Sequence, residues 1–377
     1  MRTTRVVPSR WTRGIVAAAL ASFVVLPPSS VWAQAGWYYL PETTLSETFD
    51  DNVFGTASHR QWDFISRLSS SVKVGYRSLP LTFLATSAVD GELFARTPDN
   101  DGINRTQSGI EAQWMPLSRL TLRLDGAFTK TETPSELVSN LGVELGRQSS
   151  TDLSIVPSAS YRLQRTTLLT ASYDYHRTES GDVTTTTQEP RLRLSEQFTR
   201  VDLGSITYAF RLIDSRNSSV SSNLVIVGWA RRLSPSATLI LEAGPRLSDS
   251  GAVDAEAHAT VSRRWARSLE TALTYTRTQI TLPAQIEPSN TQALVAQVTA
   301  VPLRSLTLAL TASVSTVKQK DETVSEGVGL AAVYRITRWL SAVASYRFNH
   351  SETRGVSTDH SIVSIGLQAR YPTRLDD

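Results

Sequence analysis

Apolar and polar side chains alternate with a period of two residues through most of this chain, which places unlike side chains on the two faces of a β-strand. In 119–128 the even positions are mostly apolar and the odd positions mostly polar, and 166–176 and 306–314 alternate in the same way. Shorter stretches repeat the pattern: 63–76, 153–162, 205–212, 253–262, 269–276 and 340–348. Segments 81–95 and 220–231 are ambiguous, and a first strand over 42–49 is weakly signalled. No stretch beyond residue 35 has 18 consecutive apolar residues, so the pattern predicts strands and no transmembrane helix.

The connections between these segments fall into two alternating classes. Short ones, rich in Leu, Pro and Arg, lie near residues 80, 116, 165, 200, 235, 266, 302 and 337, about 35 residues apart. Longer polar ones cover 97–106, 134–150, 180–188, 214–220, 283–291, 318–324 and 352–359. A period of about 35 residues also occurs in helical repeat proteins, but these units are Thr/Ser-rich and lack helical stripes. Eight short turns joining nine hairpins predict about eighteen strands, within a range of 16–18.

The expected strand length, roughly 10–14 residues, is enough to cross a bilayer when the strand is tilted. In lipid every backbone N–H and C=O must pair within the protein, so a membrane-spanning sheet must close on itself. Trp114, Trp229, Trp265 and Trp339 lie near short turns, where an aromatic belt at the membrane interface is expected. A soluble core would also bury such residues, but a soluble sandwich would have shorter strands. We therefore predict an all-β, antiparallel, up-and-down transmembrane barrel over 36–371.

The first 35 residues have the features of a Sec signal peptide. Four arginines precede the apolar stretch 14–26, and small residues follow at 33–35. A short N-terminal anchor is the alternative, and 372–377 would be a short C-terminal tail. Of the chain's 38 Lys+Arg and 35 Asp+Glu, the leader holds four Arg and no acid, which leaves 34 against 35 and a net charge of −1. Nothing in this balance favours nucleic-acid binding. The chain has no cysteine, which suits a protein that crosses an oxidising periplasm to the outer membrane.

Residues 45–54 read Leu-Ser-Glu-Thr-Phe-Asp-Asp-Asn-Val-Phe. This segment resembles the first strand and loop of the β-barrel porin type 2 group, whose genes often accompany exopolysaccharide or exosortase clusters. The resemblance implies a conduit for polysaccharide export. The final strand, 363–371, resembles the signal read by the barrel-assembly machinery, which makes that machinery an expected partner. It departs from the usual form because six residues follow Tyr371 instead of the chain ending there.

Catalytic and metal-binding motifs are not evident in the sequence. None of the five histidines lies at a metal-ligand spacing from another, and there is no HExxH or nucleophile-elbow motif. Asp99-Asn100-Asp101-Gly102 matches only part of a calcium loop, so a polar outer loop is the better interpretation. His176 and His258 are expected to face the lumen. We expect no enzyme activity, no metal and no cofactor.

The residues expected to line the lumen are rich in arginine, which presents a rigid fork to carboxylates, phosphates or sugar hydroxyls. These candidates for contact with a solute or polymer are Arg67, Lys73, Arg123, Arg162, Arg191, Arg193, Arg211, Arg246, Arg347 and Arg370. Rings of charge set ionic selectivity in pores, but barrel interiors also carry Arg–carboxylate networks that only hold the wall. Arg191, Arg193 and Arg211, on neighbouring strands and with few acids expected nearby, form the strongest functional group among them.

Four functions remain open at this stage. The leading one is a polysaccharide conduit, which would require a periplasmic export protein as partner. The alternative is a general diffusion porin for small, possibly anionic, solutes. An outer loop folded inside would favour the porin, and 134–150, with Leu137, Val138, Leu141, Val143 and Leu145, is the candidate. A structural barrel in the outer-membrane bilayer with no open pore, and a barrel enzyme, are the third and fourth.

Overall fold

The computed structural model describes residues 36–143, 145–216, 218–283, 285, 287–319 and 321–371. The expected signal peptide, 1–35, and the expected tail, 372–377, lie outside the described residues, so both stay predictions.

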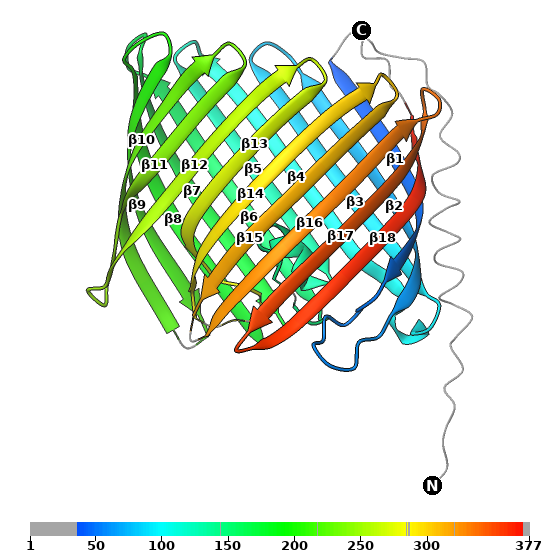
Figure 1. The fold of residues 1–377 in the computed structure, drawn as a ribbon. Coiled ribbons are helices and arrows are strands. Elements are labelled where there is room, and N and C mark those ends of the chain that lie inside the picture. Colours follow the sequence, from blue (N-terminus) through cyan, green and yellow to red (C-terminus); the bar gives the residue numbers. More distant parts are fainter. Residues whose placement is uncertain are drawn as a thin grey trace.

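Eighteen antiparallel strands form one closed sheet, in which each strand pairs with its neighbours in sequence and β1 pairs with β18 (Figure 1). The strands are β1 Trp37–Asp50, β2 Asp63–Arg77, β3 Leu81–Phe94, β4 Gly102–Leu117, β5 Leu120–Thr131, β6 Ser150–Arg162, β7 Thr167–Ser180, β8 Val183–Gln197, β9 Asp202–Ser215, β10 Ser218–Ser234, β11 Ala237–Ser248, β12 Val253–Ala266, β13 Leu269–Ile280, β14 Ser289–Leu303, β15 Leu306–Lys318, β16 Glu322–Arg335, β17 Leu340–Thr353 and β18 Val356–Arg370. Two 3-10 helices complete the fold: η1 Pro98–Asn100 and η2 Pro134–Leu141.

The predicted fold class and strand number are confirmed. The weakly signalled first strand is a full strand of 14 residues, and the two ambiguous segments form β3 and most of β10. No helix in the described ranges is long and apolar enough to span a membrane.

The two-residue alternation gives the wall two different faces. On β15, Leu310 and Val314 point outward and are 43% and 49% exposed, whereas Ser315 and Val317 point inward and are buried. The same division continues around the ring, because residues opposite each other in neighbouring strands share a face. The outside of the barrel is therefore apolar and the inside polar, as the sequence pattern predicts.

Short turns join the strands at one end of the barrel, where β1 begins and β18 ends, as the pairing of Glu42 with Arg370 shows. The opposite, outer end differs from expectation. The predicted polar loops 180–188, 214–220 and 352–359 are strand over most of their length, so these hairpins turn within two residues. The reason is local: 183–187 is Val followed by four Thr, and β-branched residues favour extended backbone. The prediction of loops in these segments, which relied on their polarity alone, is therefore wrong.

The seam between β1 and β18 is held at its outer end by the Asp-Asp-Asn part of the segment 45–54. Asn52 is fully buried; its Nδ2 donates to the carbonyls of Thr56 at 2.9 Å and Asp359 at 3.2 Å, and its Oδ1 accepts from Thr56 N–H. Asp51 Oδ1 accepts from Ser361 N–H at 2.7 Å. Asp50 Oδ1 lies 2.8 Å from His360 Nε2. These residues therefore close the barrel, which gives the motif a structural role.

Replacing Asn52 with Ala is expected to lower the free energy of unfolding by about 1–3 kcal/mol, because buried partners at the seam lose their hydrogen bonds. Urea unfolding of the protein refolded in detergent or bilayers measures this. Ser357→Ala, an exposed change on β18 near the same end, is the control and should have almost no effect. Equal stability of the two variants would show that the motif does not hold the seam.

Candidate functional site

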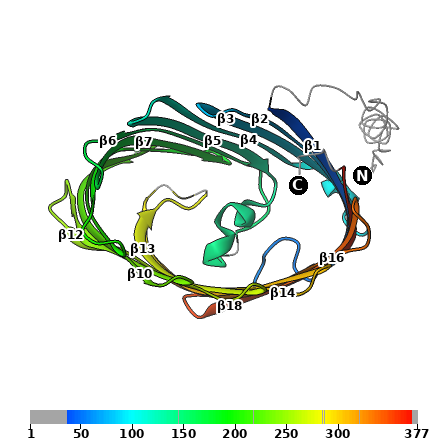
Figure 2. The ribbon, with the colours of Figure 1, turned by 90° about the horizontal axis from the view of Figure 1, so that it is seen from above.

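Two loops from the outer end fold into the lumen instead of extending away from it. The first is the β5–β6 connection, 132–149, which contains η2 and lies well inside the ring of strands (Figure 2). The second is the β13–β14 connection, 281–288. The first loop is the constriction candidate predicted from the sequence, and the structure confirms that it folds inside the barrel.

The β5–β6 loop reaches the wall on the other side of the ring. Leu141 and Val143 are buried against Leu282, Ala293 and Val317 of the β13–β15 region. Ser315 Oγ donates to the carbonyl of Leu141. In the strand order, β14 and β15 lie across the ring from β5 and β6. The loop therefore spans the lumen, and its apolar residues serve to dock it.

Ion pairs fix the same loop to the wall it leaves. Glu136 of η2 lies 3.2 Å from Arg105 and 3.8 Å from Arg67. Arg67 also pairs with the buried Glu92 at 2.5 Å, and Arg147, on the returning part of the loop, lies 3.6 Å from Glu92. Because Glu136 pairs with arginines of β2 and β4 and Arg147 pairs with the buried carboxylate of Glu92 on β3, both ends of the loop are held close to β2–β4. Arg67 thus has a partner and a structural role.

The β13–β14 loop completes the crossing. Pairing between β12 and β13 begins at Ala257 with Arg277, so the outer end of β13 is free to turn inward. There the carbonyl of Gln279 accepts from Arg211 Nη1 at 3.4 Å, and the carbonyl of Gln285 accepts from Thr185 Oγ1 at 3.5 Å. With Leu282 packed on Leu141, the two loops meet. We call them together the lumen bridge.

The prediction of an ordinary polar outer loop over 283–291 is wrong, because this connection also folds inward. The loop 134–150 is therefore one of two inward loops and not the single candidate. A signal was present: Ile280, Leu282 and Pro283 are apolar, as are several residues of the other inward loop, 134–150. What they pack against is on a distant strand, so the pattern alone could not show that they turn inward.

A network of alternating positive and negative side chains lies in the lumen near the outer end of β13, where β13 no longer pairs with β12. Arg211 is buried, with Nε 2.5 Å from Glu189 Oε2 and Nη1 2.5 Å from Glu256 Oε1. From Arg211 the network extends on both sides, and each arginine pairs only with carboxylates. Its members in order of contact are Asp174, Arg191, Glu189, Arg211, Glu256, Arg246, Asp254 and Arg277. Four arginines face four carboxylates, so the network is neutral.

This network corrects the expectation for Arg191, Arg193 and Arg211. They were expected to have few acids nearby, but Arg191 and Arg211 share Glu189, and Arg193 pairs with Glu242 at 2.8 Å. Sequence spacing missed Glu242 and Glu256 because each lies three strands around the ring from its arginine, whereas Glu189 is only two residues before Arg191 and was overlooked. Arg211 reaches Glu256 across β10, whose inward residue at that level, Ser222, is small. All three arginines are therefore ion-paired, although only Arg211 is buried.

The remaining candidates divide into paired and unpaired residues. Arg123 pairs with Asp125 at 2.7 Å, Arg246 with Asp254 at 3.1 Å, and Arg370 with Glu42 at 2.9 Å. The two-residue period places the other three inside the lumen, where within the described residues none makes an ion pair: Lys73, Arg162 and Arg347. Among the predicted candidates, these three are the ones that lack an ion pair and are therefore available to a passing solute.

The two lumen histidines that the sequence singled out lie in hydrogen-bonded positions. His176 Nε2 is 2.9 Å from Asp152 Oδ2, and His258 contacts Thr260 and Thr276. Among the described residues, the closest approach to a metal-ligand set is Asp50, Asp51 and His360 at the seam, whose ligand atoms lie within 4.8 Å of one another. Asp50 and Asp51 already accept the hydrogen bonds that close the barrel, so this group belongs to the seam.

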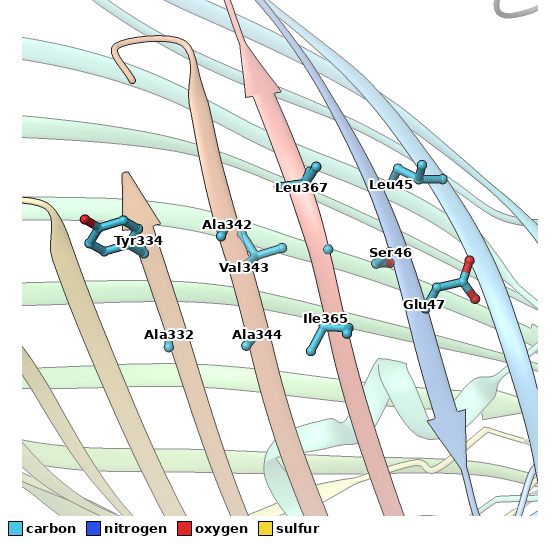
Figure 3. A pocket seen from close by; sticks show the side chains of 11 residues that line it. Leu45, Ser46, Glu47, Ala332, Tyr334, Ala342, Val343, Ala344, Ile365 and Leu367 are labelled. Carbon is cyan, nitrogen blue, oxygen red and sulfur yellow. The ribbon is translucent and has the colours of Figure 1, made fainter. Parts of the chain in front are cut away.

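A shallow groove on the outer wall lies over β16, β17, β18 and β1 (Figure 3). Its floor is made by the small side chains of Ala332, Ala342 and Ala344, and Leu45, Ile365 and Leu367 border it. Glu47 stands at one edge, where its carboxylate accepts a hydrogen bond from Ser66 Oγ at 2.8 Å. The groove is otherwise apolar and faces away from the lumen, so it is no site for a polar solute.

Comparisons with known proteins identify the fold and no family. No family model matches the chain, and no curated protein matches it. Among solved structures it is similar to OpdO of Pseudomonas aeruginosa, with 10% identity, a TM-score of 0.51, and 89% of this chain and 97% of that one covered. It is also similar to OpdK of the same organism, solved with vanillate, with 9% identity, a TM-score of 0.50, and 88% and 99% covered. The closed eighteen-stranded barrel matches outer-membrane porin structures. At these identities the likeness establishes a shared fold alone.

Removing the central arginine of the charge network tests its structural role. Arg211→Met is expected to cost about 3–5 kcal/mol in urea unfolding, because Glu189 and Glu256 are left buried with one cation fewer. Adding Glu189→Gln should recover much of this loss. Arg193→Met, which breaks a more exposed pair, is the control and should cost about 1 kcal/mol or less. If Arg211→Met cost no more than Arg193→Met, the network would not be stabilising the bridge.

Proposed function

We propose that this protein is an outer-membrane channel through which small solutes diffuse, with the lumen bridge as its constriction. The observation that carries the proposal is the docking of Leu141 and Val143 on the far wall beside Leu282. A loop that crosses the lumen and is fixed at both ends narrows a pore without sealing it at either rim. An eighteen-stranded barrel is otherwise wide enough for an aqueous channel.

The charge of the lumen supports a mild preference for anions. Most of the lumen arginines are neutralised by carboxylates, but Lys73, Arg162 and Arg347 have no carboxylate within ion-pair distance in the described part of the chain. Unpaired cations lining a pore favour the passage of anions. OpdK was solved with vanillate, a small carboxylate, which makes this class a reasonable first solute to assay here.

Three further expectations depend on this proposal. The apolar outer wall would face the bilayer, the segment 1–35 would direct export and be cleaved, and the barrel-assembly machinery would insert the barrel. No catalytic step is proposed, since the lumen groups described above hold the wall and the bridge.

Export of polysaccharide is a second candidate, supported by the resemblance of segment 45–54 to the β-barrel porin type 2 group. It would require a periplasmic export protein as partner. Two observations weigh against it: Asp50, Asp51 and Asn52 of that segment are used in closing the seam, and an extended polymer would have to pass the bridge. The diffusion channel is therefore the better supported function.

Removing the β5–β6 loop tests the constriction directly. Gln148 N–H donates to the carbonyl of Glu132 at 3.0 Å, so the loop ends are adjacent and a Gly-Ser-Gly linker can replace 134–147. Single-channel conductance in planar bilayers is expected to rise roughly twofold or more, because the narrowest cross-section is removed. Leu141→Ser with Val143→Ser keeps the loop length, loosens its docking, and should make the current fluctuate. Unchanged conductance in both variants would mean that the loop does not limit the pore.

The orientation of the wall in a membrane gives a further expected outcome. Leu310→Arg places a charge on the outer wall of β15 near its centre and should cost about 2–4 kcal/mol of stability in bilayers. Thr311→Arg, one residue along and facing the lumen, should cost far less. Similar losses for both variants would contradict a lipid-facing wall.

A strain lacking the gene separates the two candidate functions. The diffusion channel predicts unchanged amounts of secreted and periplasmic polysaccharide, with slower uptake of small carboxylates. Loss of secreted polymer, restored by the wild-type gene, would instead establish the export conduit.

A further inference from the structure

Arginine is concentrated at the short-turn end of the barrel. All eight short turns have an arginine in them or within three residues of them, and none of the turns contains Asp or Glu. These arginines, together with Arg231 and Arg263 four residues from their turns, are Arg77, Arg119, Arg162, Arg165, Arg200, Arg231, Arg232, Arg263, Arg264, Arg267, Arg304, Arg335 and Arg338. The short-turn end therefore carries a basic ring, of which the proposed channel function accounts only for Arg162.

The ring is densest at two neighbouring hairpins. Arg231 and Arg232 end β10, and Arg263, Arg264 and Arg267 surround the turn from β12 to β13. The hairpins touch, because β11 pairs with β12 and Arg264 N–H donates to the carbonyl of Ser236 at 2.8 Å. We call these five residues the basic rim.

Two of the five guanidinium groups lie against tryptophan rings on the outer wall. Arg263 stands over Trp265 at 3.8 Å from the ring centroid, and Arg231 lies 5.9 Å from that of Trp229. Both rings are on the outer face and are 56% and 38% exposed. Tryptophan on the outside of a barrel near its end marks the level of the lipid headgroups. Stacking on the ring leaves the edge of a guanidinium free to donate hydrogen bonds.

The basic rim has more positive charge than its neighbours neutralise. Arg264 lies 3.5 Å from Glu270, and Arg231 lies 3.8 Å from Asp202. Within the described residues, Arg232, Arg263 and Arg267 have no carboxylate within ion-pair distance. Arg263 lies on the outer face with Arg231, and Arg267 lies in the turn, so a second anion can reach these cations; Arg232 and Arg264 have the inward parity of their strands.

We propose that the basic rim binds the phosphate of anionic phospholipid headgroups in the leaflet at the short-turn end of the barrel. Arginine matches phosphate oxygens with paired N–H donors, and the stacked tryptophans set these donors at headgroup depth. The two turns have only two residues each, Pro235-Ser236 and Arg267-Ser268, so they barely project beyond the wall. A lipid therefore fits this surface better than a soluble acidic protein does. The inference rests on the membrane location included in the proposed function.

Lipid titration followed by native mass spectrometry tests the site. The full-length protein, folded in detergent, is titrated with phosphatidylglycerol and separately with zwitterionic phosphatidylcholine of the same chain length. The test variant is Arg231→Gln with Arg263→Gln and Arg267→Gln. The matched control removes three cations near the outer end, by Arg96→Gln, Lys130→Gln and Arg177→Gln; Arg96 there stands over Trp62 at 3.9 Å. Heat-modifiable migration on gels shows that each variant is folded.

The wild-type protein is expected to prefer phosphatidylglycerol. The basic-rim variant should bind phosphatidylglycerol more than tenfold more weakly. Each arginine is expected to contribute roughly fivefold, which corresponds to about 1 kcal/mol per arginine. The control should keep the wild-type preference. Equal binding of the two lipids by the wild type, or an equal loss in both variants, would overturn the proposal and leave an acidic protein as the partner to test. Failure of the folded protein to enter bilayers at all would instead refute the membrane location and the proposed function.

Discussion

The closure of the sheet is the constraint on which the rest of this structure depends. A strand facing lipid cannot leave its N–H and C=O groups unpaired, so β1 must find β18, far from it in sequence. Nine paired residues, from Glu42 with Arg370 to Asp50 with Ile362, form that seam. The buried side chain of Asn52 and the carboxylates of Asp50 and Asp51 extend it beyond the last pair. A motif that resembles one in a known group of barrels thus has a physical use in closing the sheet.

Closure creates a wide lumen, and the lumen bridge partly fills it. Two loops from different parts of the ring meet through a small apolar cluster around Leu141 and Leu282. The first loop is held at its base by the ion pair of Arg147 with the buried Glu92, and the second by a hydrogen bond from the ion-paired Arg211 to the carbonyl of Gln279. Buried charges of this kind require full pairing, and the strict alternation of Arg and carboxylate meets that requirement. The arginines of the outer lumen therefore act mainly as structural elements, and selectivity is left to the few unpaired cations.

Much of the fold follows from local pattern, because a strand with one lipid face and one lumen face has to alternate in sequence. On β15, Leu308 and Leu310 face outward and Ala309 between them faces the lumen, because successive side chains of a strand point to opposite faces of the sheet. Prediction was weaker at the outer hairpins. There Thr-rich segments such as 183–187 are polar enough to resemble loops yet remain extended, since β-branched residues accept strand geometry outside the bilayer as readily as inside it.

The sequence by itself determined that this chain forms a closed antiparallel barrel of about eighteen strands, with its polar face inward and its short turns at one end. These properties depend on neighbours in the chain, on a period of two residues and on the need to pair every backbone group. Only the tertiary structure decided which charges neutralise one another and which loops enter the lumen. Glu256 reaches Arg211 and Leu282 reaches Leu141 across the curvature of the ring, from strands that no sequence spacing relates. Contacts of that kind arise from closure, so they become visible only once the barrel exists.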